Sequence, residues 1–168
     1  YMFRAILQKD KQVLKALIAA LLHLKKESIH DVAITNPIEL GAAISDKDFI
    51  LDIRVNLNNE QLIDLEMQMS NEYNWSERSI SYAARSFDQL NSGEEYKEVL
   101  PVHSIGFLNF TLFEDQPEFF ATYELRNKKT GHLYSSKFSI HVLDLTRIDL
   151  ATAEDQNYEI CLLYTSDA

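Results

Sequence analysis

Two consecutive runs of alternating apolar and polar residues most constrain the fold of this chain. The apolar positions are Phe49, Leu51, Ile53, Val55 and Leu57 in the first run, and Ile63, Leu65, Met67 and Met69 in the second. A period of two is typical of a β-strand, in which successive side chains point to opposite faces. The polar segment between the runs, residues 58–60, has the composition of a tight turn. The pattern therefore predicts an antiparallel hairpin.

Parity restricts the register of this hairpin. Directly opposed residues share one face, so a slip by one residue would turn one apolar set outward. Pairing Leu57 with Gln61 closes a three-residue loop and keeps both apolar sets together, although other even registers also do so. In this register, cross-strand side chains on the opposite face lie about 5 Å apart. The pairs predicted on that face are Asp52 with Glu66 and Arg54 with Asp64.

Asp52 and Glu66 are candidate metal ligands. Two carboxylates directly opposite each other destabilise a hairpin unless a cation or a shifted protonation state compensates them. Carboxylate oxygens, completed by waters and substrate phosphate, suit Mg²⁺. The alternative is that these residues simply belong to the polar, solvent-exposed face of an antiparallel hairpin.

Residues 74–90 have a helical pattern. Asn74 and Glu77 have the spacing of a capping box. The predicted apolar stripe consists of Ile80, Ala83, Ala84, Phe87 and Leu90. A second face contains Arg78, Tyr82, Arg85 and Gln89. That face is either a solvated surface or a phosphate-contacting one.

The remaining pattern predicts an α/β fold. We expect a helix over Lys11–Leu24 and strands over residues 29–35, 99–113, 118–126 and 133–145, with a turn at 127–131. Helices and strands in this order predict a mixed sheet flanked by helices, with the core order helix, three strands, helix and strand, plus a C-terminal hairpin. Glu39 is a further candidate acidic residue near the site, with an ordinary loop position as the alternative.

The stretch from Asp46 to Gln89 carries three motifs: "ILDIRV", "IDLEMQM" and "RSISYAARSFDQL". It resembles the recombination-promoting nuclease (Rpn) family, also described as transposases, within the PD-(D/E)XK nuclease superfamily. The family pattern is an aspartate that ends a Leu-Asp pair, a Glu-x-Gln on the next strand, and a helix with Arg, Tyr and Gln. The resemblance implies a PD-(D/E)XK nuclease-like fold.

The resemblance also implies roles for individual residues. Asp52 and Glu66 would hold Mg²⁺, with Mn²⁺ as an alternative, and the carbonyl of Met67 would be a third ligand, with its side chain packed inward. Gln68 stands where the superfamily usually has Lys, as in the closer family. Its amide has a donor and an acceptor but no positive charge with which to lower the pKa of a water. The residues carried over as DNA-binding or site-supporting are Arg78, Tyr82 and Gln89.

The implied activity is that of a metal-dependent DNA endonuclease associated with recombination or transposable elements. The reaction would be hydrolysis of a phosphodiester by in-line attack of a metal-bound water. One alternative is a catalytically inactive relic that binds DNA or protein. Another is a glycosidase, whose retaining form also needs two carboxyl groups about 5 Å apart. The chain lacks an aromatic sugar platform, since Trp75 is its sole tryptophan.

The net charge of −10 argues against broad electrostatic binding to DNA, because Lys and Arg contacts to phosphates supply most non-specific affinity. The available cluster of basic residues is Lys47, Arg54, Arg78 and Arg85. We therefore expect weak, Mg²⁺-dependent binding to DNA, with any specificity supplied elsewhere.

The length of 168 residues and the 46% hydrophobic content predict one domain over residues 1–160. Residues 161–168 resemble a translated sequencing adapter and are expected to be a non-native tail, which contains the single cysteine, Cys161. No signal peptide or membrane span is recognisable, so we expect a cytoplasmic protein without a membrane partner. No paired metal-ligand spacing links the histidines, for which structural roles are expected: His23, His30, His103, His132 and His141.

Overall fold

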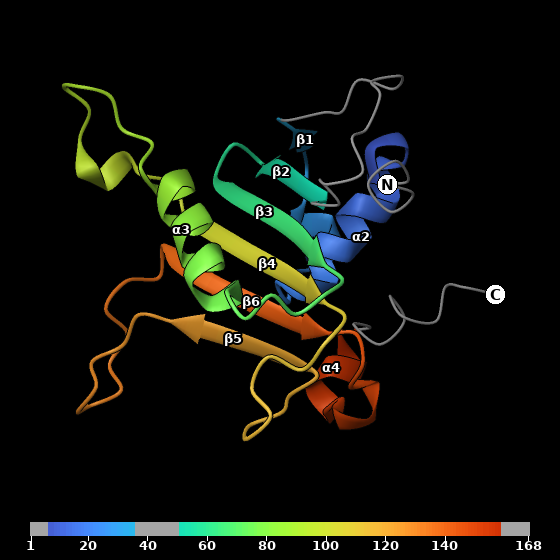
Figure 1. Ribbon diagram of the computed structural model, residues 1–168. Coiled ribbons are helices and arrows are strands. Elements are labelled where there is room, and N and C mark those ends of the chain that lie inside the picture. Colours follow the sequence, from blue (N-terminus) through green and yellow to red (C-terminus); the bar gives the residue numbers. More distant parts are fainter. Residues whose placement is uncertain (1–6, 36–50, 159–168) are drawn as a thin grey trace.

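The computed structural model describes residues 7–35 and 51–158, with the backbone alone at residues 51 and 52. Its longer elements are α2 (Lys11–Leu21), β1 (Val32–Ile34), β2 (Leu51–Leu57), β3 (Gln61–Gln68), α3 (Trp75–Phe87), β4 (Val102–Leu108), β5 (Phe120–Glu124), β6 (Phe138–Asp144) and α4 (Ala153–Asn157). Short 3₁₀ helices occur at η1 (Lys26–Ser28), η2 (Tyr96–Glu98) and η3 (Ile148–Leu150). The chain has an α/β fold (Figure 1).

Six strands form one mixed sheet in the order β1-β2-β3-β4-β6-β5 (Figure 1). The pairs β1–β2 and β2–β3 are antiparallel, β3, β4 and β6 run parallel, and β5 lies antiparallel to β6 at the edge. A parallel neighbour requires a crossover connection, and α3 lies in the one from β3 to β4. The predicted core order and the C-terminal hairpin that extends the sheet are both confirmed.

The β2–β3 hairpin has the predicted register. The ladder pairs residues 57 and 61 and places Asp52 opposite Glu66. In the loop, Asn58 and Asn59 have positive φ angles of 55° and 57°. Asn adopts this left-handed conformation more readily than most residues with a side chain, so the local sequence suits the turn.

One face of the sheet, which carries the odd-numbered residues of β2 and β3, is covered by α2. Apolar side chains from both layers form one buried cluster. Its members include Leu14, Leu17, Ile18 and Leu21 of α2, and Ile53, Val55, Ile63 and Leu65 of the hairpin. Because burial of each such side chain contributes roughly 1.5–3 kcal/mol, this contact fixes which face of the hairpin is buried against α2.

The opposite face carries the even-numbered residues and is covered by α3 (Figure 1). A second buried cluster there contains Trp75, Ala83, Val102, Leu108, Ile140 and Val142. On the same face, Asp64 and Glu66 are only 5% and 7% exposed. The alternative of a solvent-exposed position is therefore wrong for Glu66, because α3 lies over the sheet, and for Asp52 it concerns a side chain outside the described part of the chain.

Most predicted elements are present with shorter bounds. The helix α2 ends at Leu21, not Leu24, and α3 ends at Phe87, not Leu90. The strands predicted over residues 29–35, 99–113, 118–126 and 133–145 are β1, β4, β5 and β6. The predictions were too long because apolar residues in the flanking loops are also buried, as Val99 is.

The predicted stripe on α3 is wrong in detail. Ile80 is 53% exposed, and the buried positions of the helix are Trp75, Ser79, Ala83 and Ser86. Asn74 makes no side-chain capping hydrogen bond, so the predicted capping box does not form. Small polar residues, which the hydrophobic pattern overlooks, thus face the sheet.

Several predictions fall on residues outside the described ranges. They concern Glu39, Lys47 and Cys161, the domain boundary at residue 160 and the proposed non-native tail. Among the helices of the described residues, none combines the length and apolar composition needed to cross a bilayer.

Candidate active site

Glu66 lies near the middle of the sheet on the face that α3 covers. Its neighbours in the ladder are Asp52 on β2 and Gly106 on β4. A buried carboxylate needs cations or hydrogen-bond donors to offset its lost hydration. The side chain of Asp52 lies outside the part of the chain that the structure describes, so its backbone alone is placed opposite Glu66.

Gly106 lets α3 lie close to the sheet beside Glu66. A Cβ atom on Gly106 would lie 2.0 Å from Cζ2 of Trp75, the first residue of α3. The indole ring of Trp75 therefore packs directly on the β4 backbone. This close approach brings the first turns of α3 within reach of β3.

Arg78 on α3 supplies a cation to Glu66. Its Nε donates a hydrogen bond to Glu66 Oε1 at 2.6 Å, and both side chains are largely buried. The guanidinium carbon also lies 5.3 Å from the centre of the Tyr82 ring, which Arg85 approaches at 5.8 Å. Arg78 Nη2 is buried and has no hydrogen-bond partner. The predicted helix face thus contacts the predicted ligand through Arg78.

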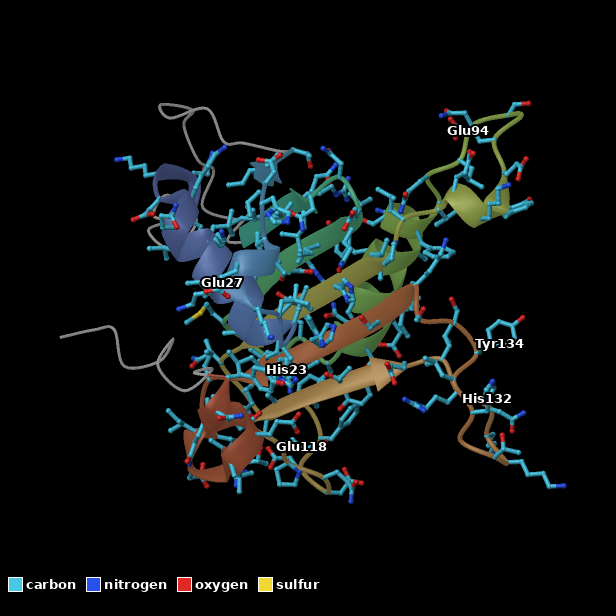
Figure 2. All side chains as sticks on the ribbon, turned by 180° about the vertical axis from the view of Figure 1, so that it is seen from behind. His23, Glu27, Glu94, Glu118, His132 and Tyr134 are labelled. Atoms are coloured by element: carbon cyan, nitrogen blue, oxygen red, sulfur yellow. The ribbon has the colours of Figure 1, made fainter. Side chains whose placement is uncertain are left out.

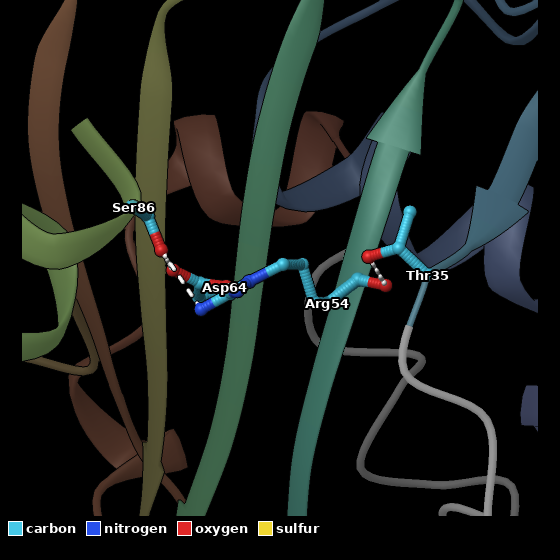
Figure 3. Close-up of polar contacts among 4 residues, drawn as sticks. All are labelled: Thr35, Arg54, Asp64 and Ser86. Carbon is cyan, nitrogen blue, oxygen red and sulfur yellow. Dashed lines mark hydrogen bonds and ion pairs between the residues drawn. The ribbon is translucent and has the colours of Figure 1, made fainter. Parts of the chain in front are cut away.

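Asp64, one alternation before Glu66, is a second buried carboxylate with an arginine partner. Arg54 Nε donates to Asp64 Oδ1 at 2.9 Å, and the Ser86 hydroxyl donates to Asp64 Oδ2. Arg54 Nη2 also donates to Ser86 Oγ at 3.1 Å. Figure 3 shows Arg54 reaching from β2 across β3 toward Ser86 on α3. The opposition of Arg54 and Asp64 was predicted, and this ladder pair is confirmed.

The hydrophobic pattern of the sequence did not identify Ser86 as a residue near the site. The available signal was its position two helical turns after Ser79, another buried serine on the sheet-facing side. Such a stripe of small residues allows a helix to lie close to a sheet, but it has no hydrophobic periodicity to reveal it.

The backbone and side chain at the end of β3 add further oxygen atoms. Gln68 Oε1 is buried without a hydrogen-bond partner. The Gln68 carbonyl accepts from the Asn109 N–H beside β4. Because carbonyls alternate along a strand, that of Met67 points toward β2. The Met67 side chain packs against the α2 side of the core, as expected.

Gln89 lies beyond the end of α3 and binds a different part of the chain. Its Nε2 donates to the Leu100 carbonyl at 3.1 Å, and its Oε1 accepts from the Leu100 N–H at 3.2 Å. The prediction that Gln89 lies on the same helical face as Arg78 and Tyr82 is wrong, because α3 ends at Phe87. These bonds instead tie the loop after α3 to the segment that leads into β4.

The donor set near Glu66 fits a hard divalent cation. It comprises a buried carboxylate, the unpartnered Gln68 Oε1 and a backbone carbonyl, and oxygen donors of this kind suit Mg²⁺. Among the side chains that the structure describes, no three His, Cys, Asp or Glu residues cluster in a way that could hold a metal. A second carboxylate would therefore have to come from Asp52.

Two members of the predicted basic cluster are engaged with carboxylates. Arg54 binds Asp64, and Arg78 binds Glu66. Arg85 is exposed and contacts the Tyr82 ring. Two of the four basic residues expected to face DNA thus compensate buried acidic residues.

The opposite face of the sheet contains a histidine pair that the sequence did not reveal. His103 Nδ1 lies 2.7 Å from Ser139 Oγ, which lies 2.9 Å from His141 Nε2. Gln61 Oε1 and Thr122 Oγ1 bind the remaining ring nitrogens at 3.0 Å. His103 lies on β4, whereas Ser139 and His141 lie on β6, so these side chains meet only because β4 pairs with β6.

Both imidazoles are held neutral. Burial lowers the pKa of His103 to about 4. Burial, together with the electrostatic effect of the nearby His103 and His23 side chains, lowers the pKa of His141 to about 3. A neutral imidazole has one donor and one acceptor nitrogen, which matches a continuous chain of hydrogen bonds through Ser139. The expected structural role fits this arrangement for both residues.

The comparison with protein families agrees with this geometry. Residues 1–163 match the family described as PD-(D/E)XK nuclease family transposase. No curated protein and no solved structure matches the chain. The match gives no support to the glycosidase alternative. The six-stranded mixed sheet, its flanking helices and a match over nearly the whole sequence lead to one conclusion: this chain belongs to the PD-(D/E)XK nuclease family transposases.

Proposed function

We propose that the protein is a metal-dependent DNA endonuclease that hydrolyses phosphodiester bonds in recombination or transposition. The observation that carries this proposal is the buried Glu66–Arg78 pair, which lies where the hairpin register brings Asp52 opposite Glu66. Family membership supports a nuclease or transposase-related role and thus a nucleic-acid substrate.

Asp52, Glu66 and the Met67 carbonyl would hold Mg²⁺ or Mn²⁺ in this proposal. Such an ion, when bound, lowers the pKa of water and neutralises charge that develops on phosphate oxygens. The proposal needs Asp52 because a divalent cation carries two positive charges, which two carboxylates balance and one carboxylate does not.

Arg78 positions Glu66. A guanidinium bound through Nε restricts the rotation of the carboxylate and offsets its burial. The packing of Arg78 against Tyr82 limits the movement of the guanidinium itself. We propose that both residues support the site in this way.

Gln68 orients the attacking water. Its Oε1 is buried without a partner and can accept a hydrogen bond from that water. Because an amide has no charge, Gln68 orients the water without making it more acidic. The remaining activation would come from the ion.

A second candidate function is a catalytically inactive relic that binds DNA or protein. One observation favours it: Arg78 already supplies Glu66 with a cation at 2.6 Å, so a purely structural ion pair could occupy the site. A relic would bind its partner without dependence on Mg²⁺ and would nick no DNA.

Plasmid nicking in Mg²⁺, in Mn²⁺ and in EDTA tests the proposal with the Glu66→Gln variant. We expect this isosteric change to reduce the nicking rate by about a hundredfold or more, because it removes charge where the transition state needs an ion. Glu77→Gln is a matched control, since Glu77 is an exposed acidic residue on α3. Glu66→Gln that remains folded and cleaves at the wild-type rate would refute the assignment.

A further inference from the structure

Asp144 at the C-terminal end of β6 is a buried carboxylate outside the proposed nuclease site. It is 3% exposed. Its Oδ1 accepts hydrogen bonds from the Thr146 N–H at 2.8 Å and the Thr146 hydroxyl at 2.6 Å. Its Oδ2 is buried and has no hydrogen-bond partner. Half of this carboxylate is therefore left without a group that replaces its lost water.

Basic side chains do not compensate Asp144. Within the described ranges 7–35 and 51–158, no Lys, Arg or His forms an ion pair with it. Burying an ionised carboxylate without a cation is costly, and such groups in proteins are usually paired or coordinate a metal. A cation or a water molecule bound to Oδ2 would offset this cost.

A small cavity adjoins this carboxylate. Its volume of about 20 Å³ is enough for a single water molecule or ion. The loop between β4 and β5 covers one side, and the strands β5 and β6 form the other. The polar residues that line the cavity are Thr111, Gln116, Glu118, Tyr123 and Asp144.

Glu118 brings a second negative charge to the cavity. It lies at the approach to β5, beside that strand's first residues (Figure 2). Glu118 is exposed and lines the cavity together with Tyr123. Burial raises the pKa of the Tyr123 phenol, and the charge of Glu118 raises it further. The cavity therefore combines two acidic residues with amide and hydroxyl oxygens.

We propose that Asp144 and Glu118 bind a Ca²⁺ ion in this cavity, with oxygen atoms of Gln116 and Thr111 as further ligands. A hard cation prefers carboxylate, carbonyl and hydroxyl oxygens. Ca²⁺ accepts an irregular arrangement of six to eight such ligands, whereas Mg²⁺ demands near-ideal octahedral geometry. A loop and a strand end supply an irregular ligand set, so Ca²⁺ fits better.

The ion would fasten the β4–β5 loop to the edge of the sheet. Gln116 and Glu118 belong to the loop and Asp144 to β6, so one ion would join two segments that are distant in sequence. Asp144 is one alternation beyond Val142, which pairs with Gly106 next to Glu66. The Ca²⁺ site lies on the same face of the sheet as Glu66, two strands away, and uses none of the residues proposed for the nuclease site.

Terbium luminescence tests the site directly, because Tb³⁺ replaces Ca²⁺ and the Tyr123 phenol is close enough to sensitise it. The protein carries Glu66→Gln throughout, which weakens binding at the other candidate site. We expect Tyr-sensitised emission that Ca²⁺ displaces, and a Ca²⁺-dependent rise in Tm. Asp144→Asn should weaken Tb³⁺ affinity by about tenfold or more.

Three further variants separate this site from other causes. Asp115→Asn is the matched control, since Asp115 is an exposed carboxylate in the same loop but does not line the cavity. Tyr123→Phe should lose the emission and keep the Ca²⁺-dependent rise in Tm. Glu118→Gln should weaken binding even if Asp144→Asn fails to fold. Equal Tb³⁺ affinity in the parent, Asp144→Asn and Glu118→Gln, or a Tm that Ca²⁺ leaves unchanged, would overturn the proposal.

Discussion

The two faces of the central sheet bury polar groups in different ways. Under α3, Asp64 and Glu66 are buried as charged groups, each bound to an arginine. On the opposite face, His103 and His141 are buried as neutral groups in a chain of hydrogen bonds. Charged groups can bind a cation or a phosphate directly, whereas a closed chain of neutral groups only holds strands together. The α3 face is therefore where we propose the chemistry, while the contacts on the opposite face hold strands together.

Among single substitutions, the largest effect is expected from Arg78→Met, which removes a cation from the α3 face. We expect the free energy of unfolding to fall by about 3 kcal/mol, because breaking a buried ion pair on one side leaves a carboxylate without that partner. Urea denaturation measures the change. Arg85→Met is the control, since Arg85 is exposed. If the unfolding free energy falls by the same small amount in both variants, the Glu66–Arg78 pair stabilises the protein no more than a surface contact does.

Gly106→Ala tests whether the α3 face depends on close packing. The added methyl group would meet the Trp75 ring at 2.0 Å, so either α3 or the ring must move. We expect a loss of about 2 kcal/mol from overpacking and a lower nicking rate through displacement of Arg78. Trp75→Phe in the same chain should restore part of the stability, since a shorter ring relieves the overlap. The absence of coupling in this double-mutant cycle would contradict the packing argument.

Acid should destabilise the histidine face. Both folded-state pKa values, about 4 and about 3, lie below the ordinary 6.5. As the pH falls below 6.5, the unfolded chain therefore binds protons before the folded one does. The free energy of unfolding decreases from about pH 6.5 down to the folded-state pKa values. We expect roughly 1.4 kcal/mol of loss per pH unit for each histidine. Chemical denaturation between about pH 7 and pH 5 measures it.

His103→Gln and His141→Gln sharpen this prediction. Each variant should reduce the pH dependence of the unfolding free energy over that range, even if it lowers stability at neutral pH. His132→Gln is a control, because His132 is exposed near the tip of the β5–β6 hairpin (Figure 2). An unchanged slope in both buried variants would show that other groups cause the acid sensitivity.

The smallest effect is expected from Ser86→Ala. This change removes the hydroxyl that binds Asp64 and Arg54, while Arg54 still holds the carboxylate. We expect a loss of about 1.5 kcal/mol, typical of a hydrogen bond to a charged group. Ser79→Ala, which removes a bond to the Ser76 carbonyl within the helix, should cost less. Equal losses of unfolding free energy in the two variants would mean that the hydrogen bond from Ser86 to Asp64 stabilises the fold no more than the bond within the helix.

The sequence predicted much of the hairpin but less of its surroundings. Alternation and parity left several even registers, and the shortest one, with a three-residue loop, gave the observed β2–β3 register and the opposition of Arg54 and Asp64. The same reasoning extended α3 to Leu90 and placed Ile80 on the buried stripe, since hydrophobic periodicity does not register buried serines. Asp144 carried no signal at all, because its cavity joins a loop to a distant strand end.

By itself, the sequence determined the fold class, the order of the elements and the hairpin that aligns Asp52 with Glu66. These follow from backbone geometry that repeats over a few residues. Only the tertiary structure decided that α3 buries the polar face, that Arg78 meets Glu66, and that His103 joins His141. Those contacts depend on which strands pair across long stretches of chain, and side-chain periodicity within one element carries no information about its distant partner.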